Sequence, residues 1–386
     1  MNSVFLLHIP KTGGTSVDAI LGESFPAHAT LRGLGGTGNL RHWYKIDSDS
    51  IQYLSGHIPA AAVDLDRFEH RITIFRSPAE CLGSLLRYSK SYFPADTLRE
   101  QLRASREPFS IYWPYFSPEW DAVRFKTELA YGVNGNIGVY GSDCSVADAA
   151  SILGRFTRVL DFRNLAAEIL RLVIEYKLFP RDTAPHLREV SSPLESPATQ
   201  NLVSHFDEAL YERAKTLFRP VPSDFKSSYD QYRRNYSTAN GLNIVSGTSV
   251  ELDLNAPLGN GWWEPEQSDL GSTFRWAIST RPTLHIPIAT AGTYCLRIYL
   301  KPMEATSLRA TVTSAVNGET RNMEHEPMNG VSVLRASIVA ADSDWLDVRF
   351  DCNQATADNQ IEGNRIFILG NVLVQREAIR RTVISP

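Results

Sequence analysis

Cysteine is scarce in this sequence, with four residues among 386. The cysteines are far apart in the chain, and no two of them have CxxC or another metal-ligand spacing. The pattern argues against a disulfide scaffold and against a cysteine-ligated metal site, and we expect reduced thiols. The four residues are Cys81, Cys144, Cys295 and Cys352.

Long hydrophobic runs and an excess of one charge are also missing. No apolar run reaches about 18 residues, the length that a membrane-spanning helix requires. The first residues lack the basic start of a signal peptide. We therefore expect no transmembrane segment and a cytoplasmic location. The net charge of -4 provides no general attraction for nucleic acid, which is not expected as a partner.

The length of the chain favours two domains. Residues 1–220 alternate β-prone runs with helical patterns, which predicts a mostly parallel, three-layer α/β domain. The expected strands include residues 4–7, 72–75 and 157–161, and the expected helices residues 17–21, 79–92, 165–178 and 208–218.

The sequence pattern changes near Pro220. Residues 221–243 are polar and begin with prolines, so we expect a linker or a peripheral strap there. Residues 244–386 contain short alternating runs separated by turn residues, which is typical of an all-β sandwich or jelly roll.

The segment from Val4 to Ser16, VFLLHIPKTGGTS, predicts an anion site. An apolar strand, a glycine-containing turn and a helix start aim backbone N–H groups and the positive end of the helix dipole at one point. Lys11 adds a full positive charge. The segment also contains three hydroxyl donors, Thr12, Thr15 and Ser16.

The order of residues in this turn separates it from a common nucleotide-binding loop. In a Walker A loop the Lys follows the last glycine, whereas here Lys11 precedes Gly13 and Gly14. This order argues against an ordinary ATPase or kinase. The alternative is a strand-turn-helix whose glycines serve only the turn.

The stretch HIPKTGGTS resembles the 5′-phosphosulfate loop of sulfotransferases that use 3′-phosphoadenosine 5′-phosphosulfate (PAPS). The likeness is to the carbohydrate-modifying branch related to heparan sulfate 2-O-sulfotransferases. It implies a P-loop-like domain. Golgi relatives of this family carry an N-terminal membrane anchor, for which this sequence has no room, so we expect a bacterial enzyme, and the mechanism requires no metal. The resemblance also implies that PAPS is held at its 5′ end by Lys11, Thr12, Gly13, Gly14, Thr15 and Ser16.

A second segment, RITIFRSPAECLGSLLRY, carries the same resemblance. Arg76 follows an expected strand, and Ser77 and Pro78 are suited to the start of a helix. Relatives of this family have an Arg followed eight residues later by a Ser, and both bind the 3′-phosphate of PAPS. The resemblance therefore implies that role for Arg76 and Ser84.

A candidate base lies between these two segments. His57 follows Ser55 and Gly56 and precedes Arg76 by nineteen residues. A histidine suits the removal of a proton from an acceptor hydroxyl near pH 7. A Gly-His pair stands at the equivalent point in the related carbohydrate enzymes, so the resemblance implies that His57 is the base. A loop histidine satisfied by a backbone carbonyl is the alternative.

These observations predict a PAPS-dependent sulfotransferase that modifies a hydroxyl of a saccharide or glycan and releases 3′-phosphoadenosine 5′-phosphate. Lys11 would stabilise the leaving oxygen and His57 would deprotonate the acceptor. Three alternatives stay open: a lipid or small-alcohol acceptor, a P-loop kinase, and a non-catalytic glycan-binding protein.

Two aromatic segments have no assigned role. Residues 108–120, PFSIYWPYFSPEW, predict either a buried cluster under a long loop or a sugar-stacking wall. In the second half, Trp262 and Trp263 are adjacent, and neighbouring side chains of a strand point to opposite faces. Together with Phe274 and Trp276, these tryptophans leave open a glycan-binding role for the second domain. A role as a scaffold or in homo-oligomerisation is open as well.

Overall fold

The structure is a computed structural model of the chain. It describes residues 3–22, 24–25, 29–34, 50–89, 110–118, 145–180, 203–256, 259, 262, 265–268, 271–277, 281–302, 307–328, 331–353 and 367–378. The chain divides into two compact units, residues 1–169 with 189–222 and residues 170–188 with 223–386. In the described part of the chain, no helix has the length and apolar character needed to cross a membrane.

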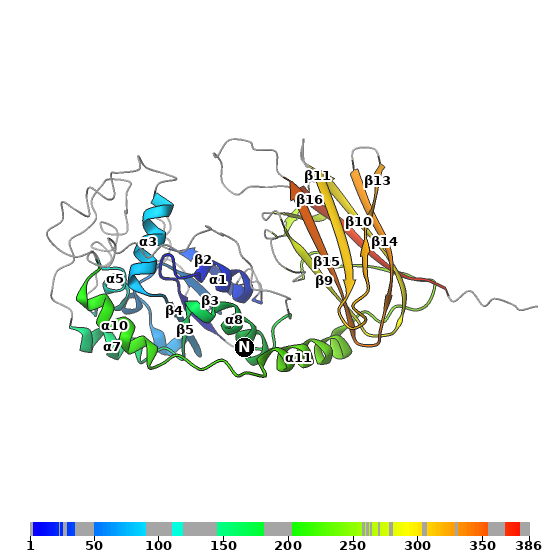
Figure 1. Cartoon of the computed structure of the whole chain (residues 1–386). Coiled ribbons are helices and arrows are strands. Elements are labelled where there is room, and N and C mark those ends of the chain that lie inside the picture. The colour runs from blue at the N-terminus through cyan, green and yellow to red at the C-terminus, as the bar shows by residue number, and fades with distance from the viewer. Residues whose placement is uncertain are drawn as a thin grey trace, which may run out of the picture. The chain divides into compact units, whose positions relative to one another are not determined.

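The first unit is built on a five-stranded parallel sheet (Figure 1). The strand order is β2-β3-β1-β4-β5, with β1 in the centre between β3 and β4. The strands are β1 (Val4–Leu7), β2 (Thr30–Leu34), β3 (Tyr53–Gly56), β4 (His70–Phe75) and β5 (Arg158–Asp161). Helix α8 (Leu165–Glu175) begins in this unit, but its residues from Leu170 on group with the second unit. The other helices are α1 (Gly14–Gly22), α3 (Pro78–Ser89), α5 (Trp113–Phe116), α7 (Val146–Leu153) and α10 (His205–Lys215).

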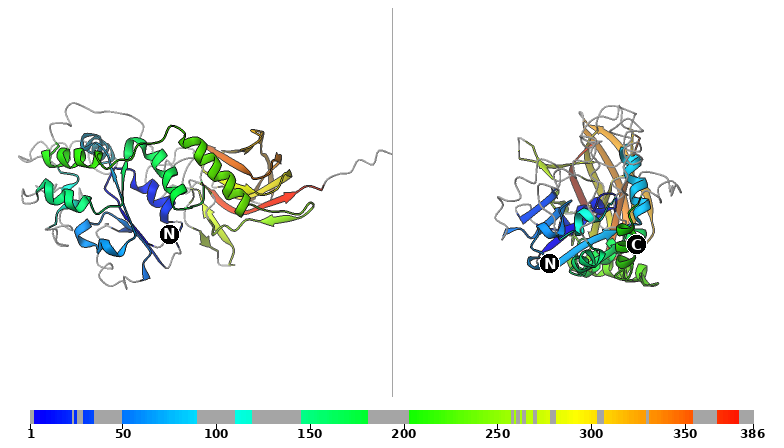
Figure 2. Two further views of the ribbon diagram at one scale, coloured as in Figure 1. Left: turned by 90° about the horizontal axis from the view of Figure 1, so that it is seen from below. Right: turned by 90° about the vertical axis from the view of Figure 1, so that its left-hand side faces the viewer.

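Helices lie on both faces of this sheet. All four residues of β1 are fully buried, and because side chains alternate along a strand, both faces must be covered. Phe5 and Leu7 pack in a cluster with residues of α5, α7 and α10. In the left view of Figure 2, α1 (dark blue) and α10 (green) lie on opposite sides of the sheet. The predicted parallel α/β architecture is therefore confirmed.

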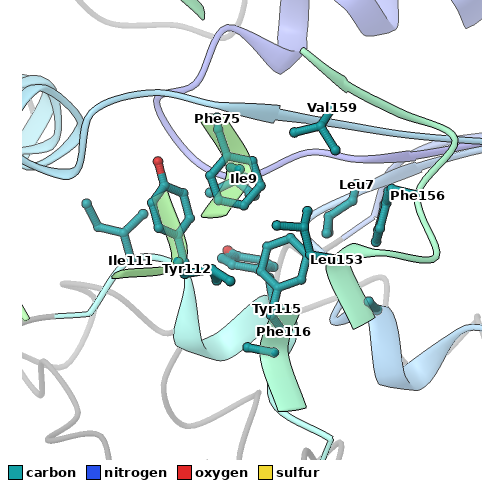
Figure 3. Packing of buried hydrophobic residues seen from close by; sticks show 14 of the residues in the cluster. Leu7, Ile9, Phe75, Ile111, Tyr112, Tyr115, Phe116, Leu153, Phe156 and Val159 are labelled. Carbon is teal, nitrogen blue, oxygen red and sulfur yellow. The ribbon is translucent and has the colours of Figure 1, made fainter. Parts of the chain in front are cut away.

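The aromatic segment forms part of this core (Figure 3). Ile111, Tyr112, Tyr115 and Phe116 are buried against the ends of β1 and β4. Asp207 of α10 holds the segment in place, because its carboxylate accepts bonds from the Ser110 hydroxyl and from the N–H groups of residues 111 and 112. For residues 110–117, the interpretation as a buried cluster is confirmed.

The second unit contains two antiparallel sheets that enclose a common core. The larger sheet has the order β13-β14-β10-β16-β8-β7, with β6 also paired to β16, and the smaller has the order β12-β11-β15-β9. The predicted antiparallel sandwich is confirmed. The strands are β6 (Ser249–Glu251), β7 (Glu266–Gln267), β8 (Thr273–Trp276), β9 (Thr283–Ile288), β10 (Gly292–Pro302), β11 (Ser307–Ser314), β12 (Thr320–Asn322), β13 (Glu324–Met328), β14 (Val331–Ala340), β15 (Asp344–Asn353) and β16 (Phe367–Arg376).

The segment expected as a linker or strap, residues 221–243, contains helix α11 (Phe225–Asn240). The helix packs on β9 and β15 and belongs to the second unit. Arg233 forms a buried ion pair with Asp347, at 2.7 Å between Nη2 and Oδ1, and the Ser237 hydroxyl donates to the carbonyl oxygens of Ile288 and Asp344. Residues 170–188, which we expected in the first domain, also group with the second unit.

Candidate functional site

The segments singled out in the first half of the sequence meet at one edge of the parallel sheet. The loop after β1, His57 after β3 and Arg76 after β4 all follow the carboxyl ends of neighbouring strands. The chain continues from β1 towards one side of the sheet and from β4 towards the other. Open α/β sheets bind ligands in the crevice at such a switch point.

The loop after β1 has the backbone form of an anion cradle. Both Lys11 and Gly13 have positive φ, 65° and 84°. When left-handed and right-handed backbone conformations alternate along a loop, successive N–H groups point towards one place. For a non-glycine residue the left-handed conformation costs roughly 1–2 kcal/mol, and such strain is typical of functional loops. Helix α1 begins at Gly14, so its first N–H groups have no partner within the helix.

Thr12 stabilises the loop from inside. It is fully buried, and its hydroxyl donates to the carbonyl of Ile9 at 2.8 Å. Its backbone N–H faces the same carbonyl at 3.4 Å. The Ser16 N–H donates to the Gly13 carbonyl at 3.1 Å. The structure thus gives the Thr12 side chain a role in shaping the turn, whereas Thr15 and Ser16 are half-buried at the start of α1.

The two glycines are required by close packing. A Cβ on Gly14 would lie 2.1 Å from Cδ2 of the His8 ring. A Cβ on Gly13 would lie 2.5 Å from Cδ2 of Leu165, in addition to the unfavourable φ. The turn therefore needs glycine at both positions, and the His8 ring lies directly against the start of α1.

His57 is held in a defined tautomer. Its Nδ1 makes a short hydrogen bond with the carbonyl oxygen of His8, and because a carbonyl can only accept, Nδ1 carries the proton. Nε2 is then the nitrogen with a free lone pair. Burial lowers the pKa of His57 below its ordinary value of 6.5, although the His8 carbonyl and the charge of Asp18 oppose that shift. The neutral imidazole is favoured at pH 7.

Arg76 connects the two predicted anion-binding segments. Its Nη1 donates to the carbonyl of Lys11 at 3.2 Å, and its guanidinium stacks on the Phe162 ring at 4.1 Å from the centroid. Its Nε also lies 3.4 Å from a carboxylate oxygen of Glu80. Ser84 lies on α3, half-buried, two turns beyond Arg76. The structure therefore brings the Arg76 side chain to the Lys11 loop.

Sequence reasoning missed a polar cluster that joins α1 to β3. One oxygen of Asp18 accepts from the hydroxyls of Tyr53 (2.8 Å) and Ser55, and the other pairs with Arg32 at 3.0 Å. Burial, followed by the charge of Asp18, raises the pKa of Tyr53 well above its ordinary value. The cluster fixes the helix that begins at the anion cradle to the strand that leads to His57. An acidic residue on an otherwise apolar helix was the signal that could have revealed it.

Phe162 and Glu80, the other neighbours of Arg76, were also missed. Phe162 directly follows β5, and β5 pairs in parallel with β4. The carboxyl ends of both strands therefore lie at the same edge of the sheet, which places Phe162 beside Arg76. A carboxylate next to Arg76 alters the site, because it partly neutralises the charge available to a phosphate.

Comparisons with known proteins identify no family for this chain. No protein-family model matches the sequence, and no curated protein matches it. Similar solved structures include the C-terminal CBM6 of LamC, a laminarinase from Zobellia galactanivorans (9% identity, 33% of this chain and 100% of that chain, TM-score 0.25). A carbohydrate-binding module from Cellvibrio mixtus lichenase 5A in complex with cellotriose gives 9% identity, 34% and 98% coverage, and a TM-score of 0.22. The CBM22-1 xylan-binding domain from Paenibacillus barcinonensis Xyn10C gives 14% identity, 34% and 97% coverage, and a TM-score of 0.24. At these TM-scores no conclusion about a ligand follows.

Proposed function

We propose that this protein is a PAPS-dependent sulfotransferase that modifies a hydroxyl group of a saccharide. One observation carries the proposal: a strained, glycine-dependent loop at a helix start, which contains Lys11, lies at the same sheet edge as His57 and Arg76. An anion cradle, a neutral imidazole and a guanidinium suit the transfer of an anionic group to a hydroxyl.

The Lys11 loop would bind the 5′ end of the donor. PAPS supplies an activated sulfuryl group when bound, and the residues that hold it must stabilise the charge that grows on the leaving oxygen. Backbone N–H groups at Gly13, Gly14 and Thr15, together with the Lys11 ammonium and the Ser16 hydroxyl, would provide that stabilisation. Thr12 would support the loop through its bond to Ile9.

His57 would remove the proton of the acceptor. With Nδ1 bonded to the His8 carbonyl, Nε2 is the atom that accepts the proton from the hydroxyl. The lowered pKa keeps this nitrogen unprotonated at neutral pH. Activity should therefore fall only as the pH drops through the pKa of His57, below 6.5.

Arg76, together with Ser84, would hold the 3′-phosphate. The two described polar contacts of Arg76 use Nε and Nη1, so its Nη2 is the donor that a phosphate could engage without breaking them. Glu80 would then be a near neighbour of the phosphate. Because like charges repel, Glu80 should weaken the binding of a 3′-phosphorylated nucleotide.

Nucleotide binding tests the donor. We expect 3′-phosphoadenosine 5′-phosphate to raise the melting temperature of the full chain far more than ATP with Mg²⁺, because a ligand at 100 times its Kd stabilises by about 2.7 kcal/mol. Arg76→Ala should weaken the binding at least tenfold, and Glu80→Gln should strengthen it. Greater stabilisation by ATP with Mg²⁺ would favour a kinase and contradict the proposal.

Acceptor transfer tests the chemistry. Labelled PAPS should transfer its label to oligosaccharides in a screen that includes lipid and small-alcohol acceptors. His57→Asn should lower kcat by at least a hundredfold, and the control His205→Asn should not, because His205 is fully exposed on α10. Near-normal turnover by the His57 variant would exclude His57 as the base. Transfer only to lipids or alcohols would overturn the saccharide assignment.

A further inference from the structure

The outer face of the larger sheet in the second unit carries two aromatic side chains on β8, on the face that points away from the sandwich core. On β8, Arg275 points inwards and is buried, whereas its neighbours Phe274 and Trp276 point outwards and are half-buried. Their rings meet edge to face, with centroids 6.3 Å apart. The Trp276 indole N–H donates to the carboxylate of Glu266 on β7 at 3.2 Å, which fixes the ring.

The adjacent strand has a glycine at the position that faces this pair. Ile368 and Leu369 of β16 pair with Trp276 and Arg275, so Gly370 comes opposite Phe274. On its other side Gly370 faces Tyr299 of β10, where the register shifts between Ile298 and Leu300. A Cβ on Gly370 would meet only Tyr299, with its nearest contact at 3.3 Å.

Gly370 has no side chain of its own and is half-buried, so within the described part of the chain its backbone is partly exposed between two aromatic residues. A glycine within a strand commonly marks such a bulge or the close approach of another molecule. Phe274 and Tyr299, both half-buried, flank this position. Strands β16, β10 and β14 lie side by side in the sandwich (Figure 1).

Basic side chains continue the same face. Arg297 of β10 is directly opposite Arg335 of β14, and Leu296, Ile298 and Leu334 on the alternate positions are in the core. Like charges directly opposite each other destabilise a sheet. Arg335 is exposed and Arg297 half-buried. No ion pair is formed by either arginine with a residue that the structure describes, but Arg335 has polar neighbours, because a hydrogen bond with Cys295 and the charges of Glu326 and Glu324 raise its pKa.

We infer that this face is a binding site for an anionic polysaccharide, with sugar rings against Phe274 and Tyr299 over Gly370 and acidic substituents at Arg297 and Arg335. Aromatic rings offer flat apolar surfaces to the C–H faces of sugars, and guanidinium groups bind sulfate and carboxylate in two-point contacts. From β8 to β14 is three strand spacings, about 14 Å, so the site matches an extended chain. An anion between the two arginines would remove their mutual repulsion. This inference does not depend on the sulfotransferase proposal.

Affinity electrophoresis of the full chain in gels containing heparin, fully desulfated heparin or neutral dextran tests the inference. We expect retardation by heparin, and at least tenfold weaker apparent binding to the desulfated and neutral polymers. Arg335→Ala and Gly370→Thr should each weaken heparin binding at least fivefold. Gly370→Thr fills the space between the aromatic rings but leaves every binding side chain in place.

Arg309→Ala is the matched control, because Arg309 is an exposed arginine of β11 in the smaller sheet. It should bind heparin as the unmodified chain does, and circular dichroism should show the same fold for all variants. Unchanged heparin binding by both Arg335→Ala and Gly370→Thr would overturn the inference, and so would equal binding to neutral dextran. The outcome does not involve PAPS, so it is distinguishable from a failure of the proposed enzymatic activity.

Discussion

Asp347→Asn should release helix α11 from the sandwich. The Asp347 carboxylate accepts from Arg233 at 2.7 Å and from His285 at 2.7 Å, and all three side chains are buried. Arg233 also stacks on the Trp345 ring, 4.8 Å from its centroid, and its carbonyl accepts from the Trp345 indole. The substitution keeps the shape of residue 347 but removes the charge that Arg233 requires.

The expected loss follows from the pKa of the carboxyl group. Burial alone would raise the pKa of Asp347, but the His285 hydrogen bond and the Arg233 charge hold it at about 2, against 3.8 ordinarily. This difference corresponds to about 2 kcal/mol of stabilisation by the ionised form. Removing one partner of a buried pair costs about 3–5 kcal/mol. We expect the free energy of unfolding of the second unit to fall by about 2 to 5 kcal/mol at pH 7.

The pH dependence has a defined sign. Because the pKa is lowered in the folded state, the stabilisation is complete above pH 4 and is lost as the pH falls through about 2. Unmodified protein should lose this contribution between pH 4 and pH 2, whereas Asp347→Asn has none to lose. Urea unfolding at pH 7 and pH 3 measures the stability, and hydrogen exchange of peptides from residues 225–240 measures the release of α11.

Asp351→Asn is the matched control on the same strand. The Asp351 side chain is 67% exposed and lies 3.8 Å from Arg281, so its substitution should change stability by no more than about 0.5 kcal/mol. If Asp347→Asn had as small an effect and left the exchange of α11 unchanged, the buried pair would not hold the helix, and the reasoning would be refuted.

Three further predictions concern the first unit. Gly14→Ala should weaken the binding of 3′-phosphoadenosine 5′-phosphate at least tenfold by calorimetry, and His8→Ala in the same chain should restore part of it, because the added methyl group meets the His8 ring; no restoration would contradict this contact. Burial raises the pKa of Asp207 to about 6. Asp207 therefore loses its proton more easily in the unfolded chain, and the free energy of unfolding should fall by about 3 kcal/mol as the pH rises from about 4 to 6. Asp207→Asn should remove that slope in urea unfolding, and an unchanged slope would refute the assignment. The kcat/KM profile should show an acid limb below pH 6.5, from protonation of His57, and an acid limb above pH 6.5 would contradict that assignment.

Local patterns predicted most of the secondary structure correctly. The expected strand over residues 4–7 has those bounds in the structure, and the strands at 72–75 and 157–161 and the helix at 208–218 differ by a few residues. Strong apolar patterns and glycine-rich turns are local signals, so neighbouring residues suffice to read them. The helix expected over residues 79–92 is described as far as Ser89, and its last residues lie outside the described part of the chain.

Helix α11 was not predicted because its helical character depends on partners remote in sequence. Residues 225–240 are polar, with mostly Tyr, Arg, Ser and Asn, and no continuous apolar stripe marks them. Their buried face consists of Tyr229, Arg233 and Ser237, and the last two bond to residues of β15 and β9 that lie more than 50 residues away. An arginine and a serine become core residues only when a sheet supplies an aspartate and free carbonyls.

The sequence by itself determined the elements and the residue types of the candidate site. A strand, a Lys-containing glycine turn and a helix start specify an anion cradle, because its donors are backbone groups of adjacent residues. Only the tertiary structure decided how the parts combine. The parallel order β3-β1-β4 brings His57 and Arg76 to the Lys11 loop. The His8 carbonyl selects the tautomer of His57, and Glu80 and Phe162 surround Arg76. These relations depend on strand pairing and side-chain contacts between distant residues, which no local pattern contains.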